Sequence, residues 1–133
     1  LRLPEDDHAL IVTFHDYSPF EFTHQGATWV SQDPPPLGRT WTGTAEEKGE
    51  IARDFGTAAA WAKANLRPLY VGEFGSYEKA DMDSRARWTA AVRAEAEKHG
   101  MSWAYWEFGA GFGAYDRAQK AWREPLLRAL VPR

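Results

Sequence analysis

The stretch Leu69-Tyr70-Val71-Gly72-Glu73-Phe74-Gly75 carries most of the information about the fold. Its apolar first part predicts a short strand that ends at a carboxylate. Because α/β folds build their sites at the carboxyl ends of strands, Glu73 is a candidate site residue. The flanking glycines would let a bulky ligand approach the backbone closely. The alternative is a structural acid paired with an arginine, since an ionisable group at the end of a buried strand needs a partner or a use.

Strands and helices alternate on both sides of this stretch. The expected elements are a strand at Ala9–Phe14, a helix from Thr44 to Leu66, a strand at Pro68–Val71, a helix from Asp81 or Asp83 to Gly100, a strand at Met101–Trp106 and a helix at Pro125–Leu130. Thr44 and Glu47 match a capping box. The first strand is continuously apolar, which predicts burial on both faces, as in a parallel sheet. Right-handed crossovers would bring the strand tips at His15, Glu73 and Trp106 to one rim.

Several other side chains are candidates for the same rim. His15 directly follows the first strand, with Tyr17 two residues later, which favours a site residue over a core histidine. The polar segment from Asp16 to Gly43 is long for a loop, and such loops are usually functional. Glu107, at the end of the third strand, is either a second catalytic acid or part of a structural ion pair.

The composition excludes several classes of function. The chain has 133 residues, a net charge of −3 and a pI of about 5.8, which suggest one domain and neither nucleic acid nor an anionic membrane as partner. No apolar run is long enough for a membrane span. Cysteine is absent, and the four histidines show no metal-ligand spacing. The segment Gly109–Ala114 formally fits a dinucleotide fingerprint, but the helix, strand and acid that should follow are missing, so we expect no cofactor.

Several segments together resemble a known family. They are Ile11-Val12-Thr13-Phe14-His15-Asp16-Tyr17, Phe22-Thr23-His24-Gln25-Gly26-Ala27 with Trp29, Val71-Gly72-Glu73-Phe74-Gly75, and Trp103-Ala104-Tyr105-Trp106-Glu107-Phe108. In order and spacing they resemble the C-terminal part of family 5 glycoside hydrolases, the cellulase-type endoglucanases. The resemblance covers nearly the whole chain from His8 onward. It implies an α/β fold in which residues 1–133 form three parallel strand–helix units, strands six to eight of a (β/α)8 TIM barrel.

The resemblance also implies roles for individual residues. Glu73 matches the nucleophile of a retaining glycosidase, and His15 with Tyr17 matches the pair that orients it. Trp106 matches the tryptophan that stacks under the sugar. Trp29, Trp41 and His24 are implied to contact substrate at neighbouring positions.

One part of the family pattern is missing from this sequence. The acid/base glutamate of the family lies in an Asn-Glu-Pro motif, which does not occur here. We therefore expect weak or no hydrolysis of β-glucan by the isolated chain. Open strand edges predict self-association or pairing with an N-terminal barrel fragment. The alternative function is a non-catalytic carbohydrate-binding or self-assembling module. The sequence leaves glucan or mannan preference open, and the resemblance implies a secreted or periplasmic location.

Overall fold

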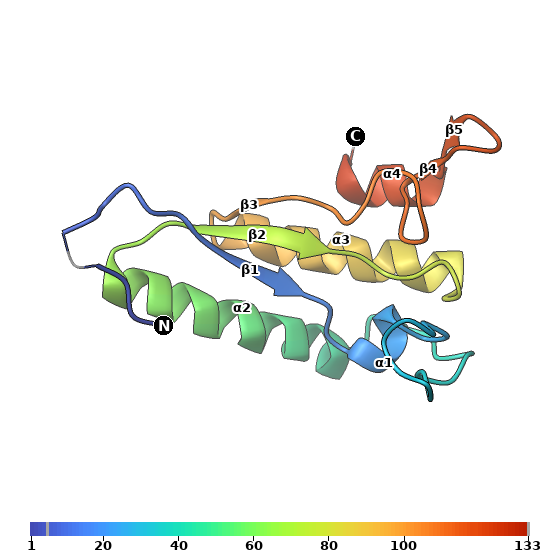
Figure 1. Cartoon of the computed structure of the whole chain (residues 1–133), viewed down its shortest axis with the longest axis horizontal. Coiled ribbons are helices and arrows are strands. Elements are labelled where there is room, and N and C mark those ends of the chain that lie inside the picture. Colours follow the sequence, from blue (N-terminus) through green and yellow to red (C-terminus); the bar gives the residue numbers. More distant parts are fainter. Residues whose placement is uncertain (5, 133) are drawn as a thin grey trace.

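The computed structural model describes residues 1–4 and 6–132, which form a three-stranded parallel sheet covered by helices (Figure 1). The elements are β1 (Val12–Asp16), α1 (Phe20–Thr23), α2 (Ala45–Asn65), β2 (Leu69–Phe74), α3 (Met82–Lys98), β3 (Ser102–Trp103), β4 (Tyr115–Asp116), β5 (Ala121–Trp122) and α4 (Glu124–Leu130). The sheet order is β1-β2-β3, and both pairings are parallel. The three predicted strand–helix units are confirmed; β4 and β5 form a separate antiparallel hairpin.

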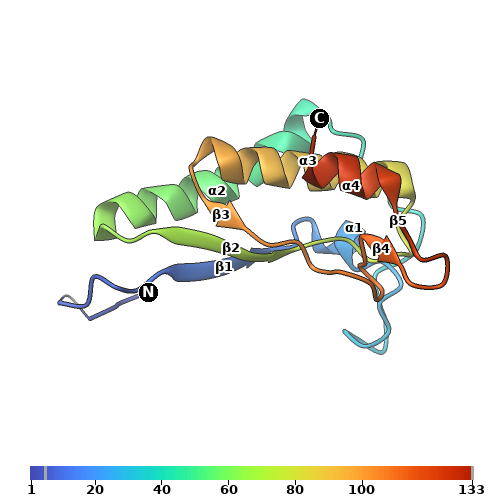
Figure 2. The ribbon, with the colours of Figure 1, turned by 90° about the horizontal axis from the view of Figure 1, so that it is seen from above.

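The sheet is covered on one face. Figure 2 shows α2, α3 and α4 on the same side of the strands, while no described helix covers the opposite face. Phe14, Val71 and Phe74 point to the helices and join the core with Phe55 of α2 and Trp88 of α3. Aromatic edges fill the space between the two layers: the Phe14 and Phe55 ring centroids lie 5.4 Å apart. The helix-covered face therefore carries most of the stabilising apolar burial.

The first strand differs from its prediction. The ladder begins at Val12, whose amide donates to the Pro68 carbonyl, and continues to Asp16. Ile11 lies before the paired region and is exposed, and alternate residues of β1 face the uncovered side. Burial on both faces was therefore a wrong prediction, because a single layer of helices covers only one face of these strands.

The two long helices begin where the sequence predicts. The Glu47 amide donates to the Thr44 hydroxyl, and the Thr44 amide donates back to the Glu47 carboxylate, so the capping box is present. Asp81 rather than Asp83 caps α3, accepting from the Ser84 amide at 2.8 Å. α2 ends with Leu66 in the left-handed conformation, just before Pro68. These caps satisfy backbone donors that the helix itself leaves unpaired.

The long segment after β1 is ordered around Gln25. Its side-chain amide donates to the carbonyls of Phe22 and Arg39, and its oxygen accepts from the Gly38 amide. A buried amide that uses both ends in this way fixes the path of a chain that has little secondary structure. The segment is thus a packed loop with one helical turn, α1, beside the carboxyl ends of the strands (Figure 1).

Candidate active site

Glu73 lies near the carboxyl end of β2 with its carboxylate partly open to solvent. The Tyr17 hydroxyl donates to Glu73 Oε2 at 2.8 Å, and His15 Nδ1 lies 3.4 Å from the same oxygen. Among the described residues the hydrogen-bond donor to Glu73 is thus the Tyr17 phenol, with the His15 imidazole beside it, and not the arginine of the structural alternative. Burial first, and then the hydrogen bond to Glu73, raise the pKa of Tyr17 well above its ordinary value. Tyr17 is therefore a neutral donor at all ordinary pH values.

A bulge in the sheet brings the histidine and the glutamate together. Phe14 pairs with Val71, but His15 pairs with Glu73, so Gly72 is the extra residue on β2. Paired residues of neighbouring strands point to the same face. In an unbroken register, with Gly72 opposite His15, Glu73 would lie opposite Asp16 and would point toward the helices. The bulge turns it to the face on which His15 lies.

The two glycines beside Glu73 make room for other parts of the protein. A Cβ on Gly72 would overlap the Thr13 hydroxyl and would lie 3.3 Å from His15 Nε2. A Cβ on Gly75 would overlap the carbonyl oxygen of Trp106. The groups that approach the backbone at these glycines in the structure are protein groups, and the approach of a ligand stays a prediction. These glycines let the residues around the carboxylate pack against the backbone of β2.

Trp106 and Trp29 line one groove. Trp106 follows β3, its amide donating to the Phe74 carbonyl at 2.8 Å, and 45% of its surface is exposed. Trp29 is 58% exposed and packs edge-on against Tyr77, with 4.6 Å between ring centroids. Together with Tyr77 and Phe112 they line an open groove of about 520 Å³. Flat aromatic faces along a groove suit ligands with apolar C–H faces.

His24 lies beneath this surface rather than on it. Only 8% of its surface is exposed, and its ring stacks on Phe20 at 4.0 Å and faces the edge of Tyr17 at 5.0 Å. Burial lowers the pKa of His24, and its Nδ1 pairs with the Thr23 hydroxyl. The prediction of direct substrate contact is corrected: His24 is a packing partner of Tyr17.

Trp41 is a core residue. It is 1% exposed and belongs to the same apolar cluster as Ile51 and Trp88, and its amide donates to the Ser84 hydroxyl of α3. The prediction that it lines a sugar site is wrong. A tryptophan in a polar loop looks exposed in the sequence, but here the loop turns inward over α3.

Glu107 holds its own loop together. Its carboxylate accepts hydrogen bonds from the amides of Ala110 (2.7 Å), Phe112 (3.3 Å) and Gly109 (3.4 Å). Within the described part of the chain Glu107 forms no ion pair, so the predicted structural ion pair is wrong. Its partners are backbone amides of the same loop. The amides of the glycine-rich loop face this carboxylate, so they are not free to cradle a phosphate as a dinucleotide site requires.

Sequence reasoning missed Phe112 and Tyr77, which connect the groove to the site. Phe112 is buried and contacts the rings of Tyr17, His24, Trp29 and Tyr77. The signal in the sequence was one aromatic residue between the glycines of a loop that otherwise lacks large side chains. In residues 1–4 and 6–132, no group of three or more His, Cys, Asp or Glu is placed to hold a metal ion, and no helix is long and apolar enough to cross a membrane.

Comparisons with known proteins agree with this geometry. The family model described as cellulase (glycosyl hydrolase family 5) matches residues 1–111. Endoglucanase H of Acetivibrio thermocellus is 34% identical over 98% of this chain, and cellodextrinase A of Ruminococcus flavefaciens is 30% identical over 77%. Among solved structures, endoglucanase Cel5A of Thermotoga maritima in complex with cellobiose is 48% identical over 98% of this chain, with a TM-score of 0.93.

The chain is much shorter than these relatives. It spans 14% of endoglucanase H, 30% of cellodextrinase A and 42% of the solved Cel5A chain. The solved relatives are (β/α)8 barrels, and the three parallel strand–helix units here are part of such a barrel. The chain therefore belongs to the cellulase family, glycosyl hydrolase family 5.

Proposed function

We propose that this chain is the C-terminal part of a retaining endo-β-1,4-glucanase and supplies its nucleophile. The observation that carries the proposal is the 2.8 Å hydrogen bond from Tyr17 to a half-open Glu73, with His15 3.4 Å from the same oxygen. The hydrogen bond from Tyr17, with His15 beside the same oxygen, fixes the carboxylate and leaves the other oxygen available for attack on an anomeric carbon. Related solved proteins are described as bound to cellobiose or mannotriose, which supports a β-linked glycan as substrate.

We assign no residue of this chain as the general acid, the second carboxyl group of the mechanism. A retaining glycosidase needs an acid about 5–5.5 Å from the nucleophile. Glu107 accepts three backbone amides of its own loop, so both of its oxygens are already engaged there and it is not assigned as the proton donor. We infer that the general acid comes from outside these residues, and that the isolated chain hydrolyses β-glucan slowly, by a factor of about 10²–10⁴ or more below a complete enzyme.

An activated substrate separates the nucleophile from the missing acid. Dinitrophenolate leaves without protonation, so a dinitrophenyl cellobioside needs only the nucleophile for the first step. If fluorine replaces the hydroxyl next to the anomeric carbon, the glycosyl–enzyme ester persists. We expect intact mass spectrometry to detect one fluorocellobiosyl group on the wild-type chain and peptide mapping to place it on Glu73.

Matched variants make this test specific. Glu73→Gln should abolish labelling, whereas Glu78→Gln, an exposed carboxylate that lines the groove, should leave it intact. An unlabelled wild type with bound cello-oligosaccharide would instead favour the alternative, a carbohydrate-binding module without catalysis. The missing Asn-Glu-Pro motif, which leaves the general acid unassigned, is the observation that favours this alternative.

Rescue by azide tests whether this chain lacks the catalytic acid/base residue. With an unfluorinated dinitrophenyl cellobioside, the second step needs a base to activate water, but azide needs none. We expect azide to accelerate turnover and to yield a β-cellobiosyl azide, since two inversions retain the configuration. Robust release of reducing sugar from soluble β-glucan without azide would mean that a residue of this chain supplies the acid.

We also propose that the open strand edges pair with a further chain segment. β1 and β3 each have one neighbour among the described strands, and unpaired edges bind other strands. Analytical ultracentrifugation of the isolated chain should therefore detect self-association. Ile11→Lys, beside the open edge, should weaken it, whereas Leu37→Lys, an equally exposed residue of the loop, should not. A stable monomer at high concentration would contradict the proposal.

A further inference from the structure

The loop after β3 contacts the candidate site through one ring. Phe112 packs edge-on against Tyr17, with 6.1 Å between ring centroids, and lies 5.3 Å from His24 and 6.3 Å from Trp29. The Tyr17 ring is thus flanked by His24 from α1 and by Phe112 from this loop. Since Tyr17 also donates to Glu73, a displacement of Phe112 would give the phenol room to leave its acceptor.

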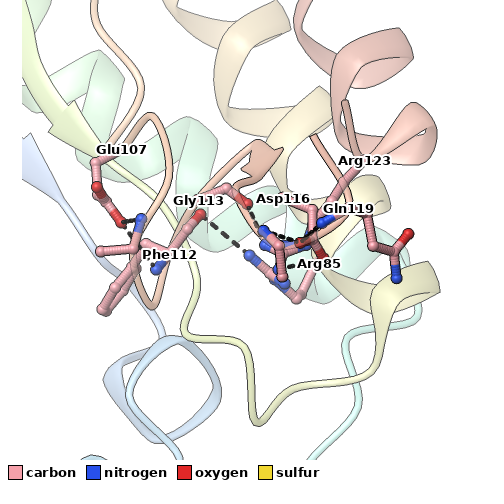
Figure 3. Close-up of polar contacts among 9 residues, drawn as sticks. Arg85, Glu107, Phe112, Gly113, Asp116, Gln119 and Arg123 are labelled. Carbon is pink, nitrogen blue, oxygen red and sulfur yellow. Dashed lines mark hydrogen bonds and ion pairs between the residues drawn. The ribbon is translucent and has the colours of Figure 1, made fainter. Parts of the chain in front are cut away.

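The main chain of Phe112 is fixed from several directions. Its carbonyl accepts from Arg85 Nη2 at 3.1 Å and from the Tyr105 hydroxyl at 2.8 Å, and its amide donates to Glu107. Figure 3 shows Glu107 on one side of the loop and Arg85 on the other. Three partners on a single residue make it the best-anchored position of the loop.

Arg85, which donates to the Phe112 carbonyl, is unusual because its charged side chain is buried. It belongs to α3, is 1% exposed, and burial lowers its pKa. Burying a guanidinium is costly, so a buried arginine directed at one loop carbonyl indicates that the position of that carbonyl matters. A second arginine, Arg123, donates to the next carbonyl, that of Gly113, and pairs with Asp116 (Figure 3).

We propose that Phe112 is a positioning residue, which holds Tyr17 against Glu73 and is itself held in place by Arg85 and Tyr105. The inference rests on the proposed function only where it concerns the rate of attack by Glu73; the position of Tyr17 is a property of the free protein. In this proposal the role of the glycine-rich loop is to place the Phe112 ring against Tyr17, and not to bind a nucleotide.

Three variants test the role of the ring. Phe112→Leu removes it and keeps an apolar side chain, and Phe112→Tyr keeps it. Phe108→Leu makes the same change at an exposed position of the same loop, where the ring stacks on Tyr115 instead. With the fluorinated dinitrophenyl cellobioside, Phe112→Leu should lower the maximal labelling rate about tenfold or more, because small misplacements at a reacting centre are costly. Phe112→Tyr and Phe108→Leu should label at close to the wild-type rate.

A second readout reports on Tyr17 directly. The ionisation of Tyr17 can be followed by NMR in protein with carbon-13 at the tyrosine Cζ, and Tyr17→Phe assigns the signal. The charged and titratable groups that face Tyr17 are Glu73 from β2, His15 from β1 beside the same Glu73 oxygen, His24 just after α1 and Tyr105 after β3. Phe112→Leu should move the midpoint of Tyr17 down toward the ordinary tyrosine value. The same change in a Glu73→Gln background should move it little, because the hydrogen bond to the carboxylate is then already lost.

These measurements separate the two proposals. If no chain is labelled, the wild type included, the proposed function fails, and the Tyr17 midpoint still decides the positioning role. An unchanged midpoint in Phe112→Leu overturns the inference, whatever the labelling rate. An equal shift in the Glu73→Gln background also overturns it, since Phe112 would then act on the burial of Tyr17 and not on its bond to Glu73.

Discussion

Asp16→Asn should stabilise the isolated chain at neutral pH. Asp16 ends β1 and is 5% exposed; its Oδ1 accepts from the Ser18 amide, whereas its buried Oδ2 has no hydrogen-bond partner in the described part of the chain. Burial raises the pKa of Asp16 from its ordinary 3.8 to about 6, with a further contribution from Asp54, against the opposing effect of the Ser18 hydrogen bond. Folding at neutral pH thus buries a charge that water would stabilise better.

The size of the effect follows from this pKa. The unfolded chain releases the Asp16 proton near 3.8 and the folded chain near 6, so below the lower value the residue costs no stability. As pH rises between the two values, the folded state loses stability relative to the unfolded state, and above about 6 the loss is complete. A difference of about two units corresponds to about 3 kcal/mol. Asparagine cannot ionise, so the variant should gain up to this amount at about pH 8 and almost nothing at about pH 4.

Chemical denaturation at the two pH values measures the difference. Asp54→Asn is the matched control: Asp54 is exposed on α2 and only adds to the field at Asp16, so its gain should be small at both values. A variant at position 16 that is less stable than wild type at pH 8, or whose gain does not depend on pH, would refute the reasoning. The first result would mean that the Asp16 carboxylate has a partner in solution, and the second that its pKa is the same in the folded and unfolded chain.

Three further substitutions probe the parts that hold the site. Gly75→Ala should destabilise the chain by about 1–3 kcal/mol because its Cβ overlaps the Trp106 carbonyl, whereas Gly56→Ala, in α2 with open space around it, should stabilise by about 0.5–1 kcal/mol in thermal or chemical unfolding. Thr44→Ala should cost about 1 kcal/mol in the same measurement, since it removes the capping box of α2. Tyr17→Phe should slow labelling of Glu73 about tenfold or more, while Tyr115→Phe should not, because Tyr115 packs on Phe108, does not line the groove and makes no hydrogen bond to the carboxylate.

The order of elements was readable from local patterns. The capping box at Thr44 depends on residues close in sequence and appears as predicted, and of the two predicted caps of α3, Asp81 or Asp83, the structure has Asp81. Parallel strands then follow from the alternation of strand and helix, because a crossover helix returns the chain to the same end of the sheet. The rim with His15, Tyr17 and Glu73 was therefore predictable as a neighbourhood.

The strand register at Gly72 and the burial of Trp41 and His24 could not be predicted from local sequence patterns. Nothing in Gly72 itself distinguishes a bulge from an ordinary strand glycine, because the bulge depends on the pairing with β1. Trp41 and His24 lie in a polar loop, and their burial depends on contacts with α3 and with the Phe20 and Phe112 rings. Long-range packing of this kind leaves no periodic signal.

The same register determines what this chain can do without other segments. Glu73, Tyr17 and His15 lie within β1, β2 and the turn after β1, so the proposed nucleophile is oriented by contacts that this chain makes by itself. Under the proposed function, a general acid has to lie across the sugar from Glu73, on a segment other than these units. Formation of the glycosyl ester from an activated donor and hydrolysis of an ordinary glucan are therefore expected to separate: the first needs only groups that are in place here, and the second needs a proton from elsewhere. Labelling without hydrolysis is the signature that this division of the two carboxyl groups predicts.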